Sequence, residues 1–120
     1  MADRVMFIGW GTPVRGREQR ALEVFNESLG LYGRMQQDGR IESFDVTLLG
    51  ANSVLNGCIQ LQGDAAQIQA LQEDEEFQRM TIDASMIVDD LNVIAGYINA
   101  GVAPQMAIFA EAIAKVPQSA

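Results

Sequence analysis

The sequence contains no histidine among its 120 residues. Histidine is the usual general base near neutral pH, the usual haem ligand and a common ligand of zinc and non-haem iron. Its absence argues against haem degradation and against most metal-dependent chemistry. We therefore expect a protein with no metal site and no tightly bound cofactor.

Cysteine is almost as scarce, since Cys58 is the only one. It cannot form a disulfide within the chain, and no nearby base favours its thiolate, so we expect a small strand residue rather than a nucleophile. The N-terminal segment lacks the basic and apolar regions of a secretory signal. No apolar run approaches the roughly 18 to 20 residues that cross a bilayer. These absences predict a cytoplasmic protein without a membrane anchor.

Positive charge is also in short supply. Eight Lys and Arg residues stand against sixteen Asp and Glu, which gives a net charge of −8. Phosphate backbones and anionic lipid surfaces repel such a chain. The charge balance predicts that neither nucleic acid nor a membrane is a partner.

Apolar residues, in contrast, make up 48% of the chain, which is enough for the core of one domain. The first half reads as strand, helix and hairpin. Residues 4–10 form a short run that is apolar at odd and even positions, which indicates a strand covered on both faces. Apolar residues recur at helical spacing from Leu22 to Met35, and Gly39 is the expected stop. Residues 42–50 and 53–63 alternate with a period of two and predict a β-hairpin.

The second half predicts two short helices, a strand and a last helix. Asp64 is a good N-cap, and the apolar stripe that follows is interrupted near "QEDEE". Residues 91–98 are again apolar at both parities and predict the fourth strand. Pro104 suits the start of a final helix over residues 103–117. We expect the apolar face of that helix to dock on the domain or on its partner; this face comprises Met106, Phe109, Ile113 and Val116.

The predicted order is β, α, β, β, α, β and an appended helix, within a single domain over residues 1–120. This order matches the ferredoxin-like arrangement, an α+β fold with a four-stranded antiparallel sheet. The run "GCIQLQGD…EEFQRM…MIVDDLNV" resembles members of the dimeric α/β-barrel superfamily, over the chain up to about Gly101. That resemblance implies a homodimer in which two sheets pair face to face to form a barrel.

The same superfamily includes antibiotic-biosynthesis-monooxygenase-like enzymes that need no cofactor, isomerases, haem-handling proteins and domains of unknown role. None of their catalytic residues aligns with this chain position by position, so none is carried over. The resemblance therefore implies a fold and a mode of pairing, and leaves open whether the chain is an enzyme.

Two charged clusters have simple structural interpretations. The acidic run from Glu73 to Glu76 lacks the spacing and the glycine of a calcium loop, and at a helix start it opposes the helix dipole. We expect it to act as a cap. Three arginines precede and open the first helix, namely Arg15, Arg17 and Arg20. They could bind an anion, but a solvated helix start balanced by Glu18 and Glu23 is the preferred reading.

A ligand site is predicted inside the barrel. The polar side of the hairpin carries Asp45, Thr47, Asn56, Gln60 and Gln62, and we expect it to face the barrel interior, where it could hydrogen-bond a small molecule. Three residues of the apolar strands would form aromatic and cationic walls. The predicted ligand-binding residues are thus Trp10, Asp45, Asn56, Gln60, Tyr97 and Arg4.

The sequence accordingly predicts a homodimer that binds a small organic molecule in a barrel pocket. A cofactor-independent monooxygenase or isomerase is the enzymatic alternative. A structural or protein-interaction module without a ligand is the third reading, in which side chains would fill the pocket.

Overall fold

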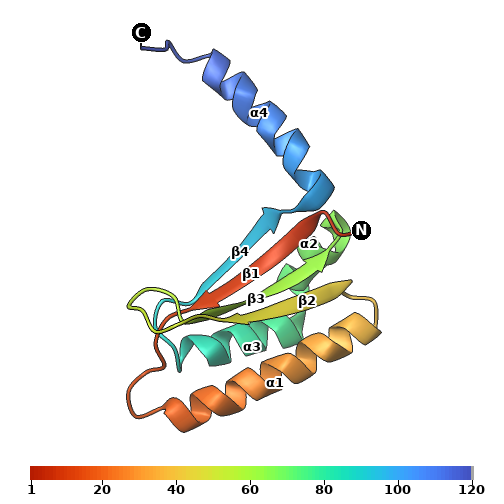
Figure 1. The fold of residues 1–120 in the computed structure, drawn as a ribbon. Coiled ribbons are helices and arrows are strands. Elements are labelled where there is room, and N and C mark those ends of the chain that lie inside the picture. The colour runs from red at the N-terminus through yellow and green to blue at the C-terminus, as the bar shows by residue number, and fades with distance from the viewer. Residues whose placement is uncertain (120) are drawn as a thin grey trace.

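The computed structural model describes residues 1–119 and contains a four-stranded sheet covered by helices on one face (Figure 1). The strands lie in the order β2-β3-β1-β4, and all neighbours are antiparallel. This arrangement confirms the predicted α+β, ferredoxin-like fold. The elements are β1 (Arg4–Trp10), α1 (Glu18–Gln37), β2 (Ser43–Leu48), β3 (Gly57–Gly63), α2 (Ala65–Glu73), α3 (Glu75–Ser85), β4 (Asn92–Tyr97), the 3-10 turn η1 (Asn99–Gly101) and α4 (Val102–Ala114).

The main core lies between the sheet and helices α1, α2 and α3. Met6 of β1 pairs with Leu61 of β3, and Ile8 pairs with Ile59, so alternate residues of the two central strands point to the same face. These four side chains are buried in one cluster with apolar residues of all three helices, among them Leu31, Met35, Leu71 and Phe77. The face with Val5, Phe7 and Cys58 has no helix over it among residues 1–119 (Figure 1).

The hairpin differs from the expected one at its second strand. The sequence pattern started that strand at Ser53, whereas β3 starts at Gly57. Asn52 accounts for the difference, because its Oδ1 accepts hydrogen bonds from the backbone N–H groups of Val54 and Leu55. Its amide also donates to the carbonyl of Leu55. These local bonds hold residues 52–55 in a loop and keep them out of the sheet.

The acidic run separates α2 from α3, as expected. Asp74 is the N-cap of α3, and its Oδ1 accepts from the Phe77 N–H at 3.0 Å. Glu75 and Glu76 occupy the first turn, where carboxylates oppose the positive end of the helix dipole. Arg40 donates to both Asp74 and Glu76. The run is therefore a cap, and Phe77 behind it is buried.

Helix α4 does not dock on its own domain, so that part of the expectation is wrong. The helix has no buried residue, and Phe109 is 60% exposed. It ends at Ala114 rather than at residue 117, so Val116, also 60% exposed, lies beyond it. It starts at Val102, before Pro104, and leaves the far end of β4 to point away from the sheet (Figure 1). Among residues 1–119, no helix combines the length and apolar character needed to span a membrane.

Candidate functional site

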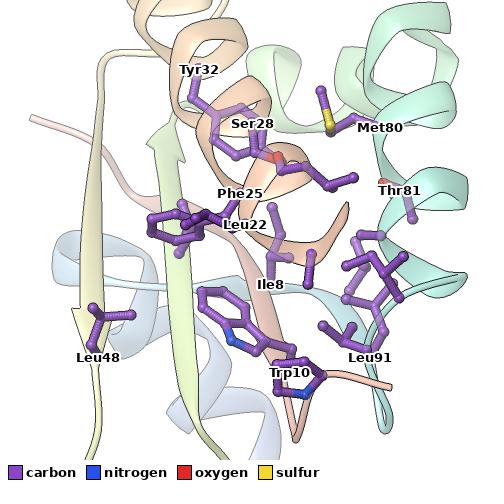
Figure 2. A pocket seen from close by; sticks show the side chains of 18 of the residues that line it. Ile8, Trp10, Leu22, Phe25, Ser28, Tyr32, Leu48, Met80, Thr81 and Leu91 are labelled. Atoms are coloured by element: carbon purple, nitrogen blue, oxygen red, sulfur yellow. The ribbon is translucent and has the colours of Figure 1, made fainter. Parts of the chain in front are cut away.

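A cavity of about 350 Å³ lies between the sheet and helices α1 and α3 (Figure 2). Nearly all of its walls are apolar. Helix α1 contributes the most lining residues, α3 and the segment between α3 and β4 contribute three each, and Pro13 and residues of the four strands complete the lining. The residues that line it are Ile8, Trp10, Pro13, Glu18, Ala21, Leu22, Val24, Phe25, Ser28, Tyr32, Leu48, Ile59, Met80, Thr81, Ala84, Ile87, Val88, Leu91 and Val93.

The cavity lies where the hydrophobic core divides into two clusters. Ile8, Tyr32 and Ile59 belong to the main cluster, whereas Val24 and Ile87 belong to a small second one. Met80 packs against both clusters. Between them the facing positions on the helices are small, since Ala21 and Ser28 lie on α1 and Ala84 on α3. Small side chains on facing elements leave unfilled volume.

Trp10 forms part of the sheet-side wall because β3 begins with a glycine. A Cβ atom at Gly57 would lie 2.7 Å from Cζ2 of Trp10 and 2.9 Å from the carbonyl oxygen of Thr47. The bare backbone of Gly57 therefore lets the indole lie across β3. The indole then meets Phe25 of α1 edge to face, with ring centroids 5.9 Å apart.

The interior of the pocket is uncharged at neutral pH. Burial raises the pKa of the Tyr32 phenol to about 12, and a side-chain hydrogen bond with Ser28 offsets this only in part. The Ser28 hydroxyl donates to the Val24 carbonyl at 2.8 Å. Glu18 is the only charged residue of the lining, and its Oε1 accepts from the Gly16 N–H at 2.7 Å. The pocket thus offers hydroxyl groups and aromatic faces.

A short pairing of two loops closes one side of the pocket. The segments before α1 and after α3 form an antiparallel bridge between Pro13 and Val88. Val14 donates its N–H to the Ile87 carbonyl at 2.8 Å. The guanidinium of Arg17 reaches across to the carbonyl of Met86 at 2.6 Å. These bonds fix the start of α1 against the end of α3, so two walls of the pocket are held together.

Of the six predicted ligand-binding residues, only Trp10 lines this pocket. Arg4 and Tyr97 lie at the opposite end of the sheet, where the guanidinium carbon is 4.5 Å from the ring centroid. With residues of α2 they line a smaller cavity of about 140 Å³. Arg4 alternates with Met6 and Ile8 along β1, and it pairs with Tyr97 of β4. Both residues therefore belong to the face that the helices cover.

The other three residues lie elsewhere. Asp45 is paired with Gln60 on the uncovered face, and its Oδ2 accepts from the amide of Gln62 at 2.8 Å. Asn56 precedes β3, and its backbone N–H donates to the Trp10 carbonyl. The predicted set is therefore divided between the two faces of the sheet and its ends.

The three arginines do not converge on a shared anion position. Arg20 is held by the carboxylates of Glu23 and Glu27 at 3.2 and 3.1 Å. Arg17 is engaged with the Met86 carbonyl, and Arg15 is exposed. This geometry favours the solvated helix start over an anion site. Within residues 1–119, no group of three or more acidic, cysteine or histidine residues is placed to hold a metal ion.

The pocket residues of α1 and α3 were not predicted from the sequence. Phe25, Tyr32 and Met80 follow the helical apolar spacing, and that pattern by itself indicates core positions. The signal that distinguishes a cavity is the presence of small residues on the same stripes, here Ala21, Ser28 and Ala84. Such residues reveal a cavity only when the two helices are known to face each other.

No protein-family model matches the chain, and no curated protein matches its sequence. Solved structures do match its fold. A dimeric protein of unknown function and ferredoxin-like fold from Bacteroides fragilis has a TM-score of 0.59 and 10% identity, over 79% of this chain and 96% of that one. A Pseudomonas aeruginosa protein has a TM-score of 0.58 and 17% identity, over 83% and 97%.

A third structure is SnoaB, a cofactor-independent oxygenase from Streptomyces nogalater. Its TM-score is 0.49 and its identity is 18%, over 82% of this chain and 94% of that one. The likeness to the Bacteroides fragilis protein confirms the ferredoxin-like fold.

Proposed function

We propose that this chain is a homodimeric binding protein for a small, neutral and largely apolar organic molecule. The ligand occupies the pocket between the sheet and helices α1 and α3. The observation that carries this proposal is the preformed cavity of about 350 Å³ with almost entirely apolar walls. Pockets of roughly 300 to 1,000 Å³ that combine apolar walls with a few polar groups are typical of small-molecule sites.

The lining defines the chemical class of the ligand. Trp10, Phe25 and Tyr32 present aromatic surfaces, which favour a flat aromatic or quinone-like ring system. The hydroxyl groups of Ser28 and Thr81 offer hydrogen bonds to one or two polar substituents. An anion has no cationic partner among the lining residues, and the net charge of −8 repels it further. The ligand is accordingly neutral, with about two fused or linked rings.

Binding is better supported than catalysis. General acid–base chemistry needs a titratable group that can reach the substrate. Among the residues that line the pocket, the one carboxylate, Glu18, is engaged with a backbone N–H. The phenol of Tyr32 keeps its proton because burial raises its pKa to about 12. The arrangement supports recognition of a ring system, and Glu18, which is exposed, is the only ionised group among the lining residues.

The pocket can be tested with two fluorescent probes of opposite character. N-phenyl-1-naphthylamine is neutral and apolar, whereas anilinonaphthalene sulfonate carries a negative charge. We expect the neutral probe to bind and to quench Trp10, and the anionic probe to bind at least about tenfold more weakly, a difference of about 1.4 kcal/mol. Equal binding of both probes would contradict the proposed ligand class.

A matched pair of variants locates the site. Ala84→Phe adds a ring to the α3 wall of the pocket and should abolish probe binding. Gln60→Leu alters the uncovered face of the sheet, where the barrel interior would be, and should leave binding unchanged. The opposite pattern would assign the ligand to the barrel and overturn the pocket assignment. Turnover of an electron-rich phenol under oxygen would instead support the monooxygenase alternative.

The homodimer is part of the same proposal. On the uncovered face of the sheet, Ile94 is 56% exposed and pairs with the half-buried Phe7, whereas Val5 and Cys58 on the same face are already buried within the subunit. An exposed apolar residue on a sheet face that no helix covers is a candidate contact with a second subunit. The similar Bacteroides fragilis protein is described as dimeric. Light scattering at micromolar concentration should give the mass of two chains, and a monomer would contradict this part of the proposal.

A further inference from the structure

Helix α4 carries an apolar seam of the kind that packs against another protein surface. Its members follow one another at intervals of four, three, four and three residues, which is the spacing that places side chains on one side of a helix. The seam consists of Val102, Met106, Phe109 and Ile113 of α4, and of Val116, which follows the end of the helix. Every one of them is between 43% and 60% exposed.

The domain to which α4 belongs leaves this seam uncovered. The helix projects beyond the sheet, and its C-terminal end lies far from α1 and α3 (Figure 1). The radius of gyration is 16.9 Å, compared with about 13.6 Å for a compact domain of this length. A 13-residue helix without tertiary contacts is only marginally stable in water. The seam therefore needs an external partner.

Charge permits a second copy of this chain as that partner. The chain as a whole has a net charge of −8, so two copies repel each other over most of their surfaces. Helix α4 and the two residues after it contain one acidic and one basic residue, Glu111 and Lys115. This segment is neutral, and it can approach an acidic copy without that repulsion.

The area of the interface leads to the same partner. The uncovered sheet face measures about 20 by 20 Å, or about 400 Å² per subunit, from the spacing and rise of four strands. A stable dimer usually buries about 800 Å² per partner. Helix α4 is about 20 Å long and 10 Å wide, which adds about 200 Å². In a two-fold dimer each subunit donates one helix and receives one, which adds about 400 Å² and reaches the usual size.

We propose that α4 is an exchanged arm, whose apolar seam packs on the second copy within the homodimer. This inference rests on the homodimer of the proposed function. Each subunit gives one arm and receives the other, and sheet pairing and arm exchange together form one interface. The ligand pocket lies at the other end of the sheet from α4 within each subunit, so it does not enter this argument.

Two full-length variants with neighbouring substitutions test the arm. Phe109→Glu places a charge in the seam, where a buried unpaired charge is costly. Ile108→Glu places the same charge on another side of the helix, at a residue of similar exposure, 57% compared with 60%. We expect sedimentation velocity to show a dimer Kd raised about tenfold or more for Phe109→Glu. For Ile108→Glu we expect a change below about twofold. Hydrogen exchange in α4 should become faster in Phe109→Glu only.

The outcomes are distinct. A monomeric wild-type chain would overturn the homodimer and the arm together. A wild-type dimer that Phe109→Glu leaves intact would overturn the arm alone, while the sheet-paired dimer and the pocket would stand. An intact dimer in which Phe109→Glu loses co-sedimentation with phosphatidylcholine vesicles would assign the seam to a lipid surface and overturn the proposal.

Discussion

At the scale of single residues, one glycine sets the shape of the pocket wall. Gly57 lets the indole of Trp10 lie across β3, and any side chain there would meet both the indole and the Thr47 carbonyl. The shape of the pocket thus depends on Gly57, which has no side chain, and on the small side chains of α1 and α3. The residue scale is also where prediction from sequence was weakest.

Gly57→Ala should therefore displace Trp10. The added methyl would come within 2.7 Å of the indole and 2.9 Å of a backbone oxygen, and overpacking of this kind costs about 1 to 3 kcal/mol. We expect the free energy of unfolding in urea to fall by that amount and the Trp10 emission to shift. Gly33→Ala is the matched control, since a Cβ there meets nothing within 4 Å. Gly33→Ala should stabilise α1 by about 0.5 to 1 kcal/mol. If it lowered the free energy of unfolding as much as Gly57→Ala, the steric explanation would be wrong.

Tyr32 gives the protein a defined response to alkaline pH. Its pKa is raised from 10.0 to about 12 by burial. Between these values the unfolded chain releases the phenol proton while the folded chain keeps it, so the free energy of unfolding falls as the pH rises. The total loss is about 2 to 3 kcal/mol, and below pH 10 this group has no effect.

The measurement is the difference in unfolding free energy between the wild type and Tyr32→Phe, followed from pH 8 to pH 11.5. Subtraction removes the contributions of other titrating groups, and we expect the difference to change only above about pH 10. A difference that stays constant across this range would show that the folded and unfolded chains titrate alike at Tyr32.

The residue scale also explains why the predicted ligand set is not brought together. A strand that is apolar at both parities gives no indication of which parity faces the helices. Residues 4–10 have this character, and so Trp10 and Arg4 were expected on the wall of a barrel. Both residues alternate with Met6 and Ile8 along β1 and so belong to the helix-covered face. Where the strand alternates clearly, as in β3, the buried side was predicted correctly.

At the scale of elements, the caps were the most predictable feature. Asp64 accepts from the Gln67 N–H while Gln67 bonds back to the Asp64 N–H, which forms a capping box. Cap chemistry depends on residues within one turn, so sequence reveals it directly. The position of α4 depends instead on a surface outside its own chain. The sequence therefore predicted the helix and its apolar face, and could not specify what that face contacts.

Asp74→Ala tests the cap between α2 and α3. The substitution removes the acceptor for the Phe77 N–H and a partner of Arg40, and loss of an N-cap costs about 0.5 to 2 kcal/mol. Glu73→Ala removes a neighbouring exposed carboxylate, with an expected change within about 0.5 kcal/mol. Thermal unfolding of the two variants should separate them clearly. Equal effects would mean that the acidic run acts only through its total charge.

At the scale of the whole molecule, the order and pairing of the strands followed from the periodicity of short segments. The ferredoxin-like fold was thus predictable. The pocket was not, because its volume arises where α1, α3 and the sheet meet, and each of these elements satisfies its own apolar pattern. A cavity depends on side-chain volumes that face each other in space, and these are known only once the elements are packed.

The same cavity makes the folded domain sensitive to hydrostatic pressure. The pocket of about 350 Å³ is partly open to solvent, and the part of it that water does not fill disappears when the chain unfolds, so compression favours the unfolded state. Pressure-dependent fluorescence of Trp10 should show a large negative volume change of unfolding. Ala84→Phe should reduce that change, because the new ring fills part of the void. The space that would admit a ligand is thus also a feature that lowers the resistance of the folded state to pressure.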